Sequence, residues 1–231
     1  PEQDTSAFNA CTSQPEEDKK PSILLWGDSH AAHLYVGYKA SFGEKYKIIQ
    51  RTAGGCLPVL NYDGSPHCKE IYKHVIELIK HEKPGKVVLA GLWTNPNLAD
   101  KTYGDNWKKI EATIAQLRKV GITDIDLIGP VPQWIDSLPK QLWLKYRSDK
   151  SHRIPERMKF GLNQNAIQLE PLISDLASRL KVNYISPIKI LCNERGCITR
   201  IGETGDTLTS FDYGHLTKSS SRFLVSQFPI N

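Results

Sequence analysis

The chain has 231 residues, of which 39% are hydrophobic and 24% are charged. No apolar run approaches the roughly 20 residues that a membrane-spanning helix needs, so the sequence predicts no transmembrane helix. The formal net charge is +5 at pH 7, and the basic residues are scattered rather than aligned, which argues against a nucleic-acid partner.

Residues 1–21 are polar, charged and proline-bearing, and we interpret them as a linker or N-terminal extension. A single domain is expected over residues 22–231. Its predicted elements, in chain order, are a strand at 23–26, a helix at 30–42, a strand at 47–51, a helix at 69–81, a strand at 86–92, a helix at 107–120, a strand at 125–129, a loop or short helix over a site at 130–155, a helix at 155–180, a strand at 182–185 and a helix at 216–228.

This alternation of strands and helices predicts an α/β fold, a three-layer α/β/α sandwich around a central, mainly parallel sheet of five strands. The run at 86–92 is apolar throughout, as expected of a strand buried on both faces. Functional residues of such sheets collect at the carboxyl ends of the strands. Ser29, the Gly54-Gly55 pair and residues 93–95 fall at such ends.

The first strand leads directly into a candidate nucleophile. Residues 23–30 read Ile-Leu-Leu-Trp-Gly-Asp-Ser-His, an apolar run that ends in a glycine, an acid and a serine. Gly27 permits a tight turn, and the helix that follows leaves backbone N–H groups free to bind an oxyanion. Ser29 could equally be a simple helix N-cap, so the local pattern leaves both interpretations open.

Asp212 and His215 supply the remaining groups of a hydrolytic centre. Three residues apart, they can place a carboxylate against one imidazole nitrogen while the other faces outward, as a Ser-His-Asp triad requires. The alternative is a surface acid and a histidine beside a helix, a common occurrence of the Asp-x-x-His pattern. Together with Ser29, however, they complete the triad in the chain order Ser, Asp, His.

The five cysteines suggest an oxidising compartment. Cys192 and Cys197 enclose a short polar turn, and Cys56 and Cys68 flank a loop rich in Gly, Pro, Asn and Asp, so each pair could form a disulfide. Free thiols in a cytosolic protein are the alternative, which the odd Cys11 keeps open. The spacing of Cys and His does not match a zinc site, and we expect no metal and no cofactor.

The Gly27-Asp28-Ser29-His30 motif near the start and Asp212-x-x-His215 near the end resemble the SGNH (GDSL-like) hydrolase superfamily. The sequence Leu-Trp-Gly-Asp-Ser-His, the cysteine-containing loop after the second strand and the Trp after the third are similar to one branch. That branch is the periplasmic SGNH domain fused to acyltransferase family 3 membrane proteins, which O-acetylate bacterial surface polysaccharides such as O-antigen. The resemblance covers roughly residues 22–228.

The resemblance implies that Ser29 is the nucleophile, His215 the general base and Asp212 its orienting acid. It places the oxyanion-hole glycine at Gly54 or Gly55. The third block of the superfamily is normally Gly-x-Asn, but here the chain reads Gly-Leu-Trp-Thr-Asn over residues 91–95, with Trp93 at the asparagine position. The hole would then use Asn95 after a shift, or only backbone N–H groups of Ser29 and Gly55.

Other side chains near these motifs have two possible roles. His30 and His33 adjoin the serine and are interpreted as packing or rim residues. Trp93 follows a strand end, where it could pack in the core or lie near the substrate and stack on a sugar ring.

The resemblance implies an acetyl transfer through an acyl-serine to a polysaccharide hydroxyl, with the acetyl donor supplied through a fused membrane domain that this chain lacks. We therefore expect a periplasmic domain tethered to the inner membrane. A carbohydrate or lipid esterase is the first alternative, because the triad chemistry is the same up to the acceptor. A non-catalytic glycan-binding module is the second.

Overall fold

The computed structural model describes residues 20–60, 66–94, 104–149, 153–202 and 207–229, with the side chains of residues 104–106 left aside. Its centre is a five-stranded sheet in the order β2-β1-β3-β4-β6, in which every neighbouring pair is parallel. The strands are β1 (Ser22–Gly27), β2 (Lys47–Thr52), β3 (Lys86–Ala90), β4 (Ile125–Ile128) and β6 (Asn183–Ile185). The predicted sheet is confirmed in strand number and direction.

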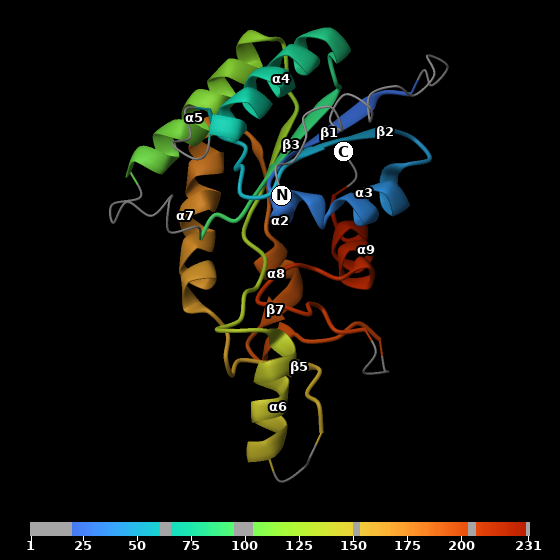
Figure 1. Cartoon of the computed structure of the whole chain (residues 1–231), viewed down its shortest axis with the longest axis vertical. Coiled ribbons are helices and arrows are strands. Elements are labelled where there is room, and N and C mark those ends of the chain that lie inside the picture. The colour runs from blue at the N-terminus through green and yellow to red at the C-terminus, as the bar shows by residue number, and fades with distance from the viewer. Residues whose placement is uncertain (1–19, 61–65, 95–103, 150–152, 203–206, 230–231) are drawn as a thin grey trace.

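Helices cover both faces of this sheet (Figure 1). One face packs against α4 (Pro66–Glu82), α5 (Gly104–Lys119) and α7 (Gln164–Leu180). The other packs against α3 (Tyr35–Phe42), α8 (Pro187–Leu191) and α9 (Lys218–Ser226). The alternation along β1 makes this possible, because Leu24 and Trp26 point into the first core while Ile23 and Leu25 point into the second. The three-layer prediction is thus confirmed.

Helices α3 and α9 join the two ends of the chain. Gly37 on α3 lies so close to α9 that a Cβ atom there would meet the carbonyl oxygen of Ser221 at 2.4 Å. The Gly37 N–H donates to Ser221 Oγ at 3.0 Å, a bond that spans 184 positions of sequence. This close approach holds the C-terminal helix beside the helix that follows the first strand.

Several elements differ from the predicted ones. The helix predicted at 30–42 is divided into α2 (Ser29–Ala32) and α3, and the predicted 130–155 segment contains a regular helix, α6 (Leu138–Ser148). The helix predicted from residue 155 begins only at α7, where Asn163 caps it by accepting the N–H of Asn165. The chain before α7 instead forms β5 (Arg157–Met158), which pairs with another strand.

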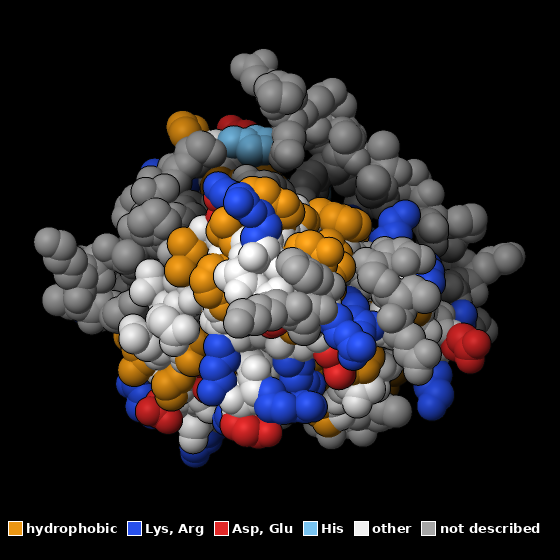
Figure 2. All heavy atoms as spheres, turned by 90° about the horizontal axis from the view of Figure 1, so that it is seen from below, with side chains coloured by type: hydrophobic (Ala, Val, Ile, Leu, Met, Phe, Trp, Pro, Cys, Tyr) orange, Lys and Arg blue, Asp and Glu red, His pale blue; other side chains and the backbone are white. Residues whose placement is uncertain are grey.

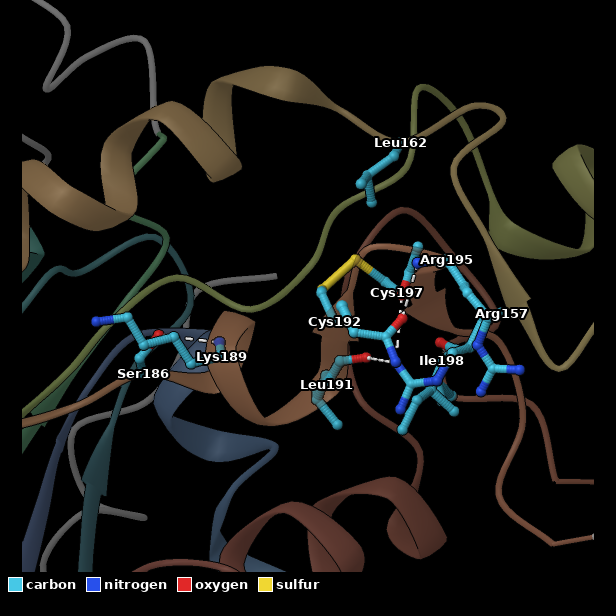
Figure 3. Close-up of a disulfide and its surroundings, with 12 residues drawn as sticks. Arg157, Leu162, Ser186, Lys189, Leu191, Cys192, Arg195, Cys197 and Ile198 are labelled. Carbon is cyan, nitrogen blue, oxygen red and sulfur yellow. Dashed lines mark hydrogen bonds between the residues drawn. A yellow bond between two sulfur atoms is a disulfide. The ribbon is translucent and has the colours of Figure 1, made fainter.

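That pairing builds a small antiparallel sheet in the order β5-β8-β7, absent from the prediction. Strands β7 (Cys192–Asn193) and β8 (Gly196–Ile198) form a hairpin closed by the Cys192–Cys197 disulfide (Figure 3). Arg157 reaches across it and donates to the carbonyl oxygens of Leu191 at 2.9 Å and Gly196 at 3.2 Å. A second disulfide joins Cys56 to Cys68, so both predicted pairings are confirmed.

None of the described helices has the length and hydropathy to cross a bilayer. The predicted extension at residues 1–21 falls almost entirely outside the described residues, and its boundary with the domain stays a prediction.

Candidate active site

Ser29 stands at the carboxyl end of β1, an inner strand of the sheet, as the first residue of α2. The helix is capped not by Ser29 but by Asp28, whose Oδ1 accepts the N–H of His30 at 2.7 Å. Asp28 Oδ2 accepts the N–H of Leu92 at 2.9 Å, which ties the turn to the chain that leaves β3. The Ser29 hydroxyl is therefore not needed as the helix cap.

Position 27, two residues before Ser29, has no room for a side chain. A Cβ atom on Gly27 would lie 1.7 Å from the carbonyl oxygen of Ala90 on β3. Asp28 itself is 1% exposed, and burial raises its pKa despite the backbone N–H groups that it accepts. Backbone contact and a buried carboxylate together fix where Ser29 begins its helix.

Ser29, His215 and Asp212 form one continuous chain of polar contacts. Ser29 Oγ lies 2.8 Å from His215 Nε2, across 186 positions of sequence. His215 Nδ1 lies 2.5 Å from Asp212 Oδ2. The structure thus brings together the three predicted residues in the order that a Ser-His-Asp triad requires.

The loop that carries Asp212 and His215 is held by its own hydrogen bonds. Asp212 Oδ1 accepts the N–H groups of Gly214 at 2.8 Å and of His215 at 2.7 Å, and the Ser210 hydroxyl at 3.0 Å. Burial raises the pKa of Asp212, but these N–H groups and the imidazole outweigh it and lower the pKa to about 2. The carboxylate is therefore ionised throughout the neutral range and available to orient the imidazole.

Two backbone hydrogen bonds connect this loop to the segment that leads into α6. The Trp134 N–H donates to the carbonyl oxygen of Tyr213 at 2.7 Å, and the Leu138 N–H donates to that of Asp212 at 2.9 Å. Sequence reasoning placed the segment at 130–155 over a site without naming these contacts.

Two further imidazoles lie beside His215. The His30 ring centroid is 4.7 Å from that of His215, and His30 Nε2 lies 3.0 Å from the Tyr213 hydroxyl. Burial and the nearby His215 lower the pKa of His30 to about 3. His33 Nδ1 accepts the N–H of Leu216 at 3.3 Å, and burial lowers its pKa well below the usual value. Both rings are thus neutral supports of the triad loop near pH 7.

The loop expected to supply oxyanion-hole donors follows β2. The Ala53 N–H donates to the carbonyl oxygen of Gly27 at 3.1 Å, and the Cys56 N–H donates to Ala53, so the loop is a turn fastened to the serine turn. Gly55 is exposed with φ of +72°. Within the described part of the chain, the N–H groups of Ser29 and Gly55 donate to no other residue. Asn95 lies outside the described residues.

Trp93 takes the core-packing role, one of the two that the sequence left open. Its side chain is 4% exposed and packs in the core on the α4, α5 and α7 face. The indole N–H donates to the carbonyl oxygen of Ile128 at 2.8 Å. Because the indole is buried in the core and its N–H is bonded to the C-terminal end of β4, neither face of the ring is open to a sugar.

In the same region Thr94 Oγ1 donates to Oε1 of the buried Gln133 at 2.9 Å. The sequence analysis included Thr94 only within the 91–95 run and did not name Gln133. Among the described residues, no group of three or more Cys, His, Asp and Glu side chains is arranged to hold a metal ion.

Comparison with known proteins identifies domains related to this chain. The family described as "SGNH domain (fused to AT3 domains)" matches residues 1–229. The periplasmic domain of a lipopolysaccharide acetyltransferase from Salmonella ser. Paratyphi A is 31% identical, with 95% of this chain and 84% of that chain covered and a TM-score of 0.82.

A carbohydrate acetylesterase family member from Sinorhizobium meliloti is 13% identical, with 90% of this chain and 94% of that chain covered and a TM-score of 0.49; a likeness this distant carries no functional argument. No curated protein sequence matches the chain. The match over nearly the whole length, together with the fold, establishes that the chain belongs to the family of SGNH domains fused to AT3 domains.

Proposed function

We propose that this domain transfers an acetyl group to a hydroxyl of a bacterial surface polysaccharide of the O-antigen type, through an acyl-serine on Ser29. The observation that carries the proposal is the unbroken contact chain from Ser29 Oγ through the His215 imidazole to Asp212. Membership of the family and the likeness to a lipopolysaccharide acetyltransferase domain support the acetyl group and the glycan acceptor.

In the proposed mechanism, each proton moves along these contacts. With the Nδ1–H of His215 donated to Asp212, Nε2 is free to take the proton of the Ser29 hydroxyl as Oγ attacks the acetyl carbonyl. The imidazolium returns that proton to the departing group, which leaves the acetyl ester on Ser29. A sugar hydroxyl then gives its proton to Nε2 and attacks the ester, and the proton finally returns to Ser29.

The negative oxygen that develops on the carbonyl needs donors. The backbone N–H groups of Ser29 and Gly55, which bind no other described residue, are proposed for this role. Asn95 remains a third candidate on the strength of the family pattern alone.

The parent protein would place this domain in the periplasm, tethered to the inner membrane, with the acetyl donor delivered through the fused membrane domain. Its partners would therefore be that membrane domain and the polysaccharide acceptor. His215 and Asp212 have side chains that are 34% and 46% exposed, so water also reaches the acid–base pair. We expect the isolated domain to act as a slow esterase when no sugar competes.

The test has two parts. A serine-directed fluorophosphonate should label the wild type and the Ser41→Ala variant, whose substitution lies on the exposed side of α3, but not Ser29→Ala. Absence of label on the wild type, or equal label on Ser29→Ala, would show that the assignment of Ser29 as the nucleophile is wrong.

Incubation with an acetyl ester, with and without oligosaccharide, then separates the two enzymatic functions. Acetylated sugar that depends on Ser29 supports transfer. Acetate alone at every sugar concentration would identify an esterase.

A further inference from the structure

The segment around α6 carries an unusual share of the exposed apolar surface. We define the α6 lobe as residues 135–149 and 153–161, which project from one end of the molecule (Figure 1). Six of the eight large hydrophobic side chains that are exposed in the described chain belong to it: Ile135, Trp143, Leu144, Tyr146, Ile154 and Phe160. A concentration of this kind marks an interaction surface rather than ordinary scatter.

The outward face of α6 is where a surface helix should be polar. Leu138, Gln141 and Leu142 form the buried face of the helix. The opposite face carries Lys140, Trp143, Leu144 and Arg147, at helical spacings of three and four. Trp143 is 53% exposed, and the Arg147 guanidinium lies 4.8 Å from the centre of its ring. An indole and a leucine therefore face solvent between two cationic side chains.

The lobe is also the basic part of the chain. The lobe contains six Lys and Arg against three Asp and Glu, a net +3, while the whole sequence carries a net +5. Asp136 and Asp149 pair with Lys140 and Lys145. Arg147, Arg153 and Lys159 form no ion pair with a described carboxylate. Figure 2 shows the basic and apolar side chains interspersed at this end of the molecule.

We propose that the α6 lobe docks on the surface of an anionic phospholipid bilayer. Exposed Trp and Tyr suit the headgroup level, aliphatic and Phe side chains reach the acyl boundary, and Lys and Arg bind the anionic headgroups. A glycan would also stack on Trp143 and Tyr146. It would gain nothing from the exposed aliphatic side chains Ile135, Leu144 and Ile154, which a lipid interface accommodates.

Docking through this lobe has a geometric consequence that rests on the proposed function. Leu138 of the lobe and the adjoining Trp134 donate backbone hydrogen bonds to the loop that carries Asp212. Contact of α6 with the bilayer would therefore fix the height of the triad above the membrane, where the donor emerges.

The test is co-sedimentation of the 231-residue protein with vesicles. We expect binding to phosphatidylcholine vesicles that contain a third of phosphatidylglycerol, about tenfold weaker binding to phosphatidylcholine alone, and a loss of binding as salt is added. The paired variants Trp143→Ser/Leu144→Ser and Lys140→Glu/Arg147→Glu should each lower the affinity about tenfold.

The control variants make changes of the same kind at exposed positions outside the lobe. Leu172→Ser on α7 is the control for the loss of apolar surface, and Lys45→Glu/Lys119→Glu is the control for the charge reversal. These should bind like the wild type. The proposal is overturned if the wild type binds neither vesicle, if the controls lose as much affinity as the lobe variants, or if light scattering shows a dimer that the lobe variants disperse. Protection of Trp143 fluorescence by polysaccharide without vesicle binding would also overturn it.

The outcome is independent of catalysis. Ser29→Ala should bind vesicles like the wild type, and the lobe variants should keep their fluorophosphonate labelling in solution. Failure of the triad and failure of the docking surface are therefore distinguishable.

Discussion

The two halves of the candidate active site are held in different ways. The serine turn is built into the core: Asp28 is 1% and His30 4% exposed, and Gly27 touches the backbone of the neighbouring strand. The acid–base loop is half-open, with the side chains of Asp212 and His215 46% and 34% exposed. Its position depends on hydrogen bonds from Ser210, Gly214 and the α6 lobe rather than on buried apolar contacts.

Because of this difference, we expect substitutions at the nucleophile and at its base to affect different properties of the domain. Changes at the serine turn should act through the stability of the whole domain, because they disturb the contact between β1 and β3. Changes at the acid–base loop should act on turnover while the fold persists.

The largest expected effect is on turnover. His215→Ala should lower kcat for an acetyl ester about 10⁵-fold and Asp212→Asn about 10³-fold, since removing the base ends proton transfer while removing the charge only misorients it. The smaller loss at Asp212 follows from its exposure, which lets water replace part of the carboxylate. Steady-state kinetics on purified variants measures both.

Asp175→Asn, at an exposed position on α7, is the matched control and should leave kcat unchanged. Both triad variants should keep the melting temperature of the wild type within a few degrees. If either unfolds, the loop is part of the core and the comparison between the halves is wrong.

The next effect concerns stability. Gly27→Ala should lower the free energy of unfolding by about 3 kcal/mol or more, because the new methyl group meets a backbone oxygen that cannot move without separating β1 from β3. Gly55→Ala has open space around it but a φ of +72°, so it should cost only about 1 kcal/mol. Urea denaturation gives both values. Equal losses of unfolding free energy would mean that the serine turn accommodates an added methyl group as easily as the loop after β2 does.

The smallest effect is a pH dependence of stability. The pKa of His30 is about 3 in the folded protein against an ordinary value of 6.5. Between these values the unfolded chain binds a proton that the folded chain does not, so stability is full above pH 6.5 and is lost as the pH falls. From pH 7 to pH 5 the loss from this residue should be about 2 kcal/mol.

His30→Gln should remove that part of the loss, whatever its effect at pH 7. His81→Gln, at a side chain that is 87% exposed, should not. An unchanged pH dependence in His30→Gln would show that the ring is protonated, or solvated, in the folded protein.

The central sheet could be predicted from the sequence because most of its strands contain a short apolar run and alternate with helical periods along the chain. Strands β5, β7 and β8 could not, since each has only two or three residues and exists through pairing with partners distant in sequence. The sequence left the α6 segment open as a loop or a short helix. Trp143, Leu144 and Tyr146 stand on the exposed side of α6, which blurs the usual apolar stripe toward the core.

At the site, the residues of the triad were recognisable because their types and order carry chemistry. The role of Trp93 stayed open, because nothing local shows that its N–H bonds to Ile128 on the neighbouring strand. The contacts of Asp28 with Leu92 and of His30 with Tyr213 are likewise invisible in sequence. They join segments that only the folded sheet brings together.

The close packing of α3 against α9 has a consequence for the stage of folding at which catalytic activity can first appear. Ser29 emerges among the first residues of the domain and its base among the last, and the bond from Gly37 to Ser221 completes the link between them. A nascent chain delivered N-terminus first therefore holds an inert hydroxyl until α9 docks. Ester cleavage should therefore report on the final long-range step of folding, because a partly folded chain holds Ser29 without its base.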